Sequence, residues 1–243
     1  MVAMTTPRRP DPGIDTPTTF VRLLGSAVVC ALSSLFLAAG GLLVLAIALL
    51  VVASCLGLAA YAWARSGALA KPAVWAELAA TLPPDTTIRS LDLGCGRGVA
   101  LFAVAEWTGG DAVGIDRWIA AQQSGNHQRV TAANIGLLNL DDRVRLATAD
   151  VAALPLDAAQ FDVVTASLVL ISLDEPVRQR VLEECERVLR PGGLLLVVEA
   201  RRPRNVQDSL RAGGWTVEPL SANLSRQPWP RLFALRARRP VDP

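Results

Sequence analysis

The chain has 243 residues, of which 51% are hydrophobic and 19% are charged, and its formal net charge is +2. A chain of this length holds one large domain or two small ones, and its apolar content excludes general disorder. So small a charge gives no reason to expect a nucleic-acid partner. The four cysteines stand far apart without a CxxC pair, which predicts neither disulfides nor a metal site and favours a reducing compartment.

Residues 1–22 are rich in proline and threonine and include the basic pair Arg8-Arg9. A stretch of this composition cannot bury enough apolar surface to offset the entropy of ordering it. We therefore expect a disordered tail over residues 1–22.

Residues 23–64 carry no charge and are almost wholly Leu, Val, Ala and Gly. One membrane-spanning helix needs about 20 apolar residues, so the run predicts a transmembrane anchor of two helices, Leu23–Ala39 and Leu42–Ala62. The break is expected at residues 38–41, and one long or bent helix is the alternative. A secretory signal fits less well, although Ala60-Tyr61-Ala62 resembles a cleavage site, because its apolar region spans only about 7–15 residues.

Basic residues flank the apolar run, with Arg22 before it and Arg65 and Lys71 after it. Positively charged flanks favour the cytoplasmic side of a membrane. A hairpin would place both flanks there, so the prediction is a protein of the cell membrane whose remaining residues are cytoplasmic.

Residues 65–87 are expected to form a linker and a short amphipathic helix. Pro72 suits a first helical turn, and Val74, Trp75 and Leu78 recur at helical spacing before Pro83-Pro84 ends the pattern. This helix either packs on the domain that follows or forms a lid over a substrate.

From residue 88 to residue 243, short apolar strands alternate with helices. This pattern predicts a doubly wound, Rossmann-like, mostly parallel seven-stranded α/β sheet, preceded by the hydrophobic helix or hairpin. The strands are expected near residues 88–93, 112–115, 144–147, 161–166, 194–198, 215–220 and 232–237.

The first strand of this domain runs directly into a glycine-rich turn, Gly94-Cys95-Gly96-Arg97-Gly98, and then into a helix. Ligands bind beyond the carboxyl ends of the strands in doubly wound sheets, so the turn should form the floor of a cofactor pocket. The dinucleotide pattern GxGxxG fails at Val99, and the Gly-Lys-Ser/Thr of a P-loop is absent. Asp116, at the end of the second strand, can accept hydrogen bonds from both hydroxyls of a ribose.

The stretch from about residue 88 to residue 200 resembles the class I S-adenosylmethionine-dependent methyltransferases in five motifs that occur in order. They are the glycine loop with Asp92, Gly114-Ile115-Asp116, Ala149-Asp150-Val151 with Leu154-Pro155, Phe161-Asp162-Val163-Val164, and residues 187–193. Residues 114–126 further resemble uncharacterised bacterial members with hydrophobic amino termini. The resemblance implies S-adenosyl-L-methionine as the cofactor.

The resemblance also implies a role for each matching residue. The loop Gly94, Cys95, Gly96 and Gly98 would meet the methionine part of the cofactor, with Cys95 as a small loop residue. Asp92 would orient the ammonium through water, and Asp116 would hold the ribose. Further residues would contact the adenine, or the methionine or acceptor: Arg117 or Trp118 over the adenine face, Asp150 and Val151 at its edge, and Ser167 at the methionine or acceptor.

The implied reaction is direct displacement of the methyl group, for which a general base is optional and no metal is required. His127, the single histidine, is a weak candidate for a catalytic base, as is Ser167; a solvated loop histidine is the other interpretation. The anchor suggests a lipid or other apolar small-molecule acceptor at the membrane. The alternatives are a non-catalytic, membrane-attached module that binds the cofactor and, less favoured, an NAD-type oxidoreductase.

Overall fold

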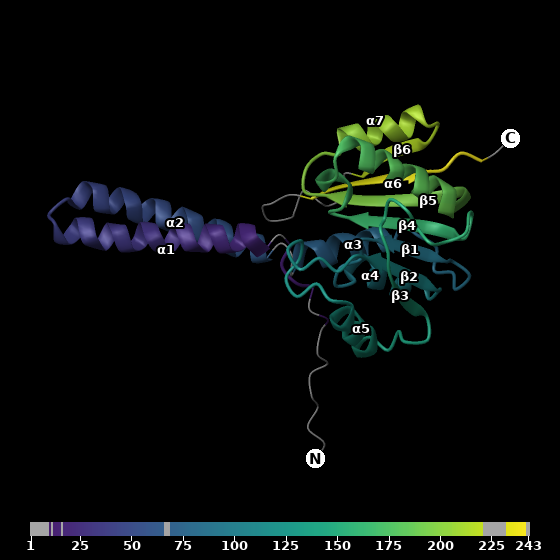
Figure 1. Ribbon diagram of the computed structural model, residues 1–243, viewed down its shortest axis with the longest axis horizontal. Helices are drawn as coiled ribbons and strands as arrows, with labels where there is room; N and C mark the ends of the chain where they lie inside the picture. The colour runs from purple at the N-terminus through teal and green to yellow at the C-terminus, as the bar shows by residue number, and fades with distance from the viewer. Residues whose placement is uncertain (1–9, 11, 16, 66–68, 221–231, 242–243) are drawn as a thin grey trace, which may run out of the picture.

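The computed structural model describes residues 10, 12–15, 17–65, 69–220 and 232–241. Two helices, α1 (Pro17–Ala39) and α2 (Leu43–Arg65), form an antiparallel hairpin that projects from an α/β domain (Figure 1). The chain reverses at Gly41, whose φ of +80° is easily reached only by glycine. The predicted pair of apolar helices is therefore confirmed, with the break where it was expected.

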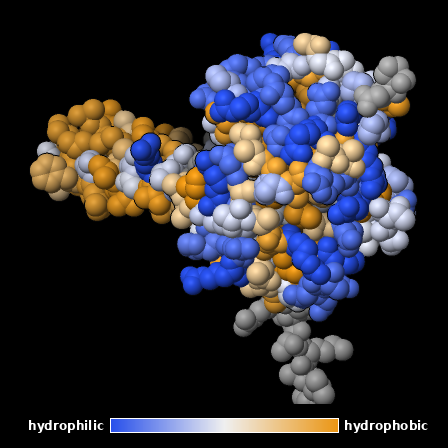
Figure 2. Space-filling view, turned by 45° about the vertical axis from the view of Figure 1, so that its right-hand side comes forward, coloured by the Kyte–Doolittle hydropathy of each residue, from blue (hydrophilic) through white to orange (hydrophobic). Residues whose placement is uncertain are grey.

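Small side chains allow the two helices of the hairpin to approach each other closely. Ala46, Ala53 and Ala60 are buried and recur every seven residues along α2, and the Ser34 hydroxyl donates to the carbonyl of Ala46 at 2.6 Å. Close packing through small residues is typical of helices in a lipid environment. The outer surface of the hairpin is almost entirely apolar (Figure 2), and both helices are long and apolar enough to cross a bilayer.

The boundary of the tail differs from the expectation. Helix α1 begins at Pro17 rather than near residue 23, because a proline in the first turn needs no hydrogen-bonded N–H. Residues 12–15 are also ordered: Gly13 is buried and Asp15 forms an ion pair with Lys71. The other residues of the predicted tail before α1 lie outside the described residues, except for Pro10. They are residues 1–9, 11 and 16.

Helix α3 (Lys71–Ala79) follows the hairpin and packs on the α/β domain. Val74 and Trp75 are fully buried in one cluster with Ala100 and Val104 of α4 (Val99–Thr108). The apolar face of the helix is therefore directed into the core, as the packing interpretation requires, and does not form a lid.

The sheet has seven strands in the order β3-β2-β1-β4-β5-β7-β6, in which β1 to β5 are parallel and β7 is antiparallel to both of its neighbours. The predicted doubly wound fold is confirmed, and the strand order reverses between β1 and β4. The strands are β1 (Ser90–Leu93), β2 (Ala112–Asp116), β3 (Val144–Thr148), β4 (Phe161–Ser167), β5 (Leu189–Glu199), β6 (Thr216–Leu220) and β7 (Phe233–Arg238).

Strand β5 is longer than the sequence indicated. The expected turn Arg190-Pro191-Gly192-Gly193 is included in the strand, with an irregularity in register against β4 between Phe161 and Val163. Pro191 is accommodated at this bulge because it needs no ladder hydrogen bond there.

Helices cover both faces of the sheet. Leu195 and Val197 of β5 pack toward α6 (Glu175–Val188) and α7 (Arg204–Ala212), whereas the alternate residues Leu196 and Val198 pack toward α3 and α4. Helix α5 (Gln128–Leu137) packs beside α4 through Ile135. Because both faces are covered, the carboxyl ends of β1, β2 and β4 form the edge at which a ligand can bind.

Candidate functional site

The glycine loop has the left-handed backbone that its sequence predicts. Gly94 and Gly96 have φ values of +61° and +49°. A Cβ atom on Gly94 would lie 2.6 Å from Val169, and one on Gly96 would lie 2.4 Å from the side-chain oxygen of Gln123. The loop is therefore held closely between the β4–α6 connection and the segment around Gln123, and neither position has room for a side chain.

Asp92 joins this loop to its two neighbouring elements. The carboxylate is buried and accepts from the Thr165 hydroxyl of β4 at 2.6 Å and from the N–H of Leu101, in the first turn of α4, at 3.1 Å. Burial raises the pKa of Asp92 to about 7, despite these two hydrogen bonds. Its observed contacts position α4 against the sheet, and the expected ammonium role stays a prediction.

Asp116 connects the end of β2 to the glycine loop. One carboxylate oxygen accepts from the Gly96 N–H at 2.8 Å, and the other accepts from the Trp118 N–H at 2.6 Å and from the side-chain amide of Asn126 at 3.2 Å. The oxygen of the Asn126 side chain is buried and has no hydrogen-bond partner among the described residues. An acceptor without a donor, next to a buried carboxylate, suits the hydroxyl groups of a sugar.

The residues predicted to hold an adenine lie together at the ends of β2 and β3. Arg117 lies 3.5 Å from the Asp150 carboxylate, and both side chains are about half exposed. The indole N–H of Trp118 donates to the Thr148 hydroxyl at 2.8 Å, which fixes the ring at this edge. Asp150 accepts from the Ala152 N–H at 2.9 Å, so it also shapes the turn that contains Val151.

Ser167 ends β4 on the other side of the glycine loop. Its hydroxyl accepts a hydrogen bond from the indole N–H of Trp75 at 2.9 Å. The next residues are held by Glu199 at the end of β5, which accepts from the N–H groups of Leu170 and Ile171 at 2.8 and 3.2 Å. Burial raises the pKa of Glu199 to about 7.

A segment before the hairpin completes the site, and we call residues 12–15 the N-terminal strap. The Asp15 carboxylate accepts from Lys71 at 2.9 Å and from the Gln123 amide at 2.9 Å, while Gln123 accepts from the N–H of Arg97 in the glycine loop at 2.9 Å. The Asp15 carbonyl accepts from the indole of Trp63 near the end of α2. The strap thus connects the base of the hairpin to the glycine loop.

Two residues near the loop with chemically reactive side chains, His127 and Cys95, have ordinary surroundings. His127 is exposed immediately before α5, whereas its neighbour Asn126 is buried against Asp116. Cys95 is buried, and burial together with the nearby Asp92 and Asp116 raises the pKa of its thiol well above its usual range. A thiol kept protonated favours the packing interpretation of Cys95.

Several residues of the site were missed in the sequence. Four of them, Thr165, Glu199, Asp15 and Lys71, support the site from elements far from the loop along the chain and lie in none of the motifs. Gln123 lies in the stretch 114–126, but its contact with the loop was not predicted. The available signal was polar character inside apolar strands, as for Thr165 and Glu199. Among the described residues, no group of three or more His, Cys, Asp or Glu side chains forms a metal centre.

Known methyltransferases resemble this chain in sequence. Residues 91–197 match the family model described as a methyltransferase domain. The chain is 31% identical over 141 residues to a demethylmenaquinone methyltransferase of Roseiflexus castenholzii, covering 58% of this chain and 53% of that protein. It is 29% identical over 123 residues to a sterol 4-C-methyltransferase of Caenorhabditis elegans, covering 51% of this chain and 34% of that protein. The chain spans about half or less of the length of these relatives.

Solved structures share the fold at low sequence identity. A SAM-dependent methyltransferase from Aquifex aeolicus superimposes with a TM-score of 0.54 at 18% identity, covering 68% of this chain and 88% of that one. The 4+2 cyclase SpnF superimposes with a TM-score of 0.57 at 20% identity, covering 74% of this chain and 84% of that one. The fold alone is therefore compatible with more than one reaction.

Proposed function

We propose that this protein is a class I S-adenosylmethionine-dependent methyltransferase that methylates an apolar small-molecule or lipid acceptor at the cytoplasmic face of the cell membrane. The match of residues 91–197 to a methyltransferase-domain model and the similarity to named methyltransferases support the proposal. The observation that carries the proposal is the Asp116 carboxylate, which joins the glycine loop to the buried amide of Asn126. This arrangement offers oxygen acceptors for a ribose beside a loop that only glycine can form.

The residues present fit S-adenosylmethionine. Asp116 and the unpartnered Asn126 oxygen would accept hydrogen bonds from the two ribose hydroxyls. A 2′-phosphate would remove one of these donors and place a negative charge beside the Asp116 carboxylate. Trp118 would cover the adenine, and Asp150 with the Val151 N–H would contact its edge. The buried Lys71 forms an ion pair with the partly exposed Asp15, and this pair would face the carboxylate and ammonium of the methionine end.

When bound, the cofactor supplies a sulfonium whose methyl carbon is electrophilic. The protein contributes orientation: the glycine loop is held between the β4–α6 connection and Gln123, which the strap also contacts, and this rigid support would fix the bound cofactor relative to an acceptor. Alignment of two reactants in this way provides much of the rate in a displacement. Ser167 and His127 remain weak candidates for contact with the acceptor.

Two observations support an apolar acceptor at the membrane. The relatives include enzymes whose names specify a menaquinone precursor and a sterol. The apolar hairpin, with Arg22 before its apolar run and Arg65 at its end, would hold the domain at the cytoplasmic surface. Both the membrane location and the acceptor class belong to the proposal.

The test uses the full chain in lipid nanodiscs. We expect saturable binding of S-adenosylhomocysteine in a calorimetric titration and no comparable binding of NAD. Incubation with isotope-labelled S-adenosylmethionine and a total lipid extract should move the label into the organic phase. Binding of NAD in place of S-adenosylhomocysteine would contradict the cofactor assignment.

The second candidate is a protein that binds the cofactor without transferring its methyl group. It is retained because the SpnF cyclase, whose name specifies another reaction, shares the fold. The same titration and labelling experiment separates the two. Binding of S-adenosylhomocysteine without transfer of label to lipids, proteins or soluble metabolites would support a binding module or another reaction on the same fold.

A further inference from the structure

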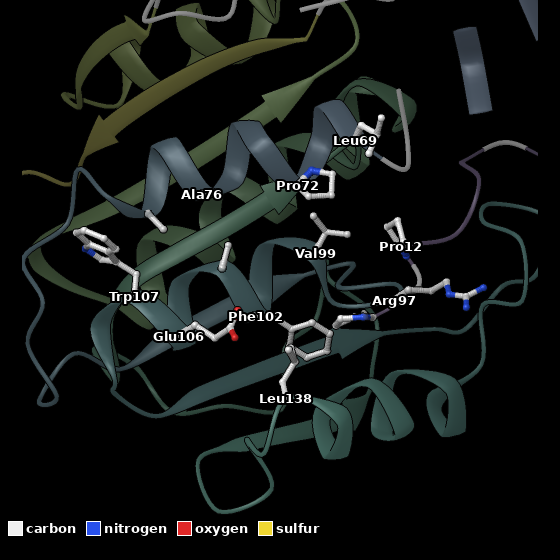
Figure 3. Close-up of a pocket in the computed structure, with 13 residues that line it drawn as sticks. Pro12, Leu69, Pro72, Ala76, Arg97, Val99, Phe102, Glu106, Trp107 and Leu138 are labelled. Carbon is white, nitrogen blue, oxygen red and sulfur yellow. The ribbon is translucent and has the colours of Figure 1, made fainter. Parts of the chain in front are cut away.

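An apolar groove lies between α3 and α4, on the surface of the domain (Figure 3). Its volume is about 570 Å³, which is within the usual range for sites that bind small molecules. Arg97 and Glu106 are its two charged lining residues. The remaining lining residues are prolines, alanines and leucines together with Val99, Phe102 and Trp107.

Helix α4 is apolar on its outer face as well as its inner face. Leu101 and Val104 are buried in the core, but Val99, Ala103 and Trp107 face the groove, and Trp107 is 44% exposed. A helix at the surface of a soluble domain normally has a polar outer face. Apolar side chains on the outer face of α4 are therefore left partly exposed, as expected for a surface that binds an apolar molecule.

Small residues of α3 leave room for a narrow occupant. Pro72, Ala76 and Ala79 lie on one side of the helix at intervals of four and three residues and face α4 across the groove. An extended polypeptide segment would bring unpaired backbone N–H and C=O groups that this lining cannot satisfy. A flexible hydrocarbon chain has no such groups, and it can follow a narrow channel.

The groove reaches the base of the hairpin. Pro12 and Leu69 lie at the end of the groove opposite Trp107 (Figure 3), close in sequence to the start of α1 at Pro17 and the end of α2 at Arg65. If the hairpin lies in a bilayer, this end faces the membrane surface. A lipid chain could then enter directly from the bilayer. Its hydrocarbon would be little exposed to water, and such exposure is unfavourable.

We propose that the groove binds the alkyl or isoprenoid chain of a membrane lipid. This inference rests on the proposed function and narrows the acceptor to a molecule with a hydrocarbon tail. Arg97 belongs both to the lining of the groove and to the glycine loop. A chain seated in the groove therefore begins beside the loop that is assigned to the cofactor.

The test is photolabelling of the full chain in nanodiscs with a palmitate analogue that carries a diazirine near its end, followed by peptide mapping. Adducts are expected on α3 and α4 in addition to the hairpin. Ala76→Trp places a large side chain in the groove from an exposed position and should reduce labelling of α4 about tenfold. Ala73→Trp, at an exposed position of the same helix outside the groove lining, is the matched control and should label like the wild type.

Labelling confined to α1 and α2, or equal labelling of α4 in both variants, would overturn the proposal. So would a mass that halves in the Ala76→Trp variant, since the groove would then be an interface between two copies. Titration with S-adenosylhomocysteine on the same samples separates the two levels of inference. Normal binding without labelling of the groove contradicts the lipid site alone, whereas loss of binding in the wild type contradicts the proposed function.

Discussion

Two buried carboxyl groups near the glycine loop, Asp92 and Glu199, have pKa values that burial raises to about 7. Both accept hydrogen bonds from neighbouring elements, so each combines a structural role with a high cost of ionisation. At the scale of single residues, these groups should make the stability of the domain depend on pH.

Asp92→Asn should remove part of this pH dependence. The folded state holds the Asp92 proton up to about pH 7, whereas the unfolded chain releases it near 3.8. The wild type should therefore lose stability relative to the variant as pH rises through this range, by at most about 4 kcal/mol. Thermal unfolding followed by circular dichroism between pH 4 and 8 measures the difference. Parallel curves for the two proteins would contradict the assignment, and the exposed Asp142→Asn should follow the wild type.

Glu199 should act by holding the β4–α6 connection in place. Glu199→Ala leaves the buried N–H of Leu170 and the N–H of Ile171 without their acceptor, at a cost of about 1–3 kcal/mol for the buried donor. Because Val169 contacts Gly94, the affinity for S-adenosylhomocysteine should fall as well. Glu199→Gln keeps an acceptor oxygen. It should stay close to the wild type both in its free energy of unfolding and in its affinity for S-adenosylhomocysteine. Equal behaviour of the two variants would show that the hydrogen bonds are unimportant.

At the scale of elements, the glycine loop has little freedom to change. Gly96→Ala adds a Cβ atom 2.4 Å from the Gln123 side chain at a position with φ of +49°. We expect a loss of about tenfold or more in affinity for S-adenosylhomocysteine, measured by calorimetry. Gly136→Ala in α5 is the matched control, since its nearest neighbour would be 3.8 Å away, and binding should be unchanged. Full affinity in Gly96→Ala would place the cofactor elsewhere.

The sequence predicts the elements better than it predicts the contacts between them. Alternation of apolar runs and helices, the glycine loop and Asp116 at the end of a strand are local patterns, and each was found where expected. Asp15 meets Gln123 from 108 positions away, and Thr165 meets Asp92 from 73. Such contacts depend on how the chain folds back on itself, so local periodicity does not reveal them. The early start of α1 was missed because proline was interpreted as a sign of disorder.

At the scale of the whole molecule, the strap connects the hairpin to the candidate cofactor site. Asp15 contacts Trp63 of α2, Lys71 of α3 and Gln123 beside the glycine loop. The base of the hairpin and the cofactor site therefore share one residue. A variant that lacks the hairpin and all residues before it would also lack Asp15. Its binding of the cofactor would therefore not represent that of the full chain.

Asp15→Ala in the full chain should weaken binding of S-adenosylhomocysteine about tenfold, because Lys71 and Gln123 lose the carboxylate that positions them. Association with lipid vesicles, measured by flotation, should be unchanged. Glu77→Ala, an exposed acid on α3, serves as the control and should change neither property. Unchanged cofactor affinity in Asp15→Ala would separate the strap from the site.

The central claim is that Asp116 holds the sugar of S-adenosylmethionine beside the glycine loop. Calorimetric titration of the full chain in nanodiscs with S-adenosylhomocysteine, for the wild type and for Asp116→Asn, tests it most directly. We expect saturable binding by the wild type and an affinity about 100-fold lower in the variant, equivalent to about 2.7 kcal/mol, in a protein that still shows a cooperative thermal transition. Equal affinity in the two proteins would contradict it.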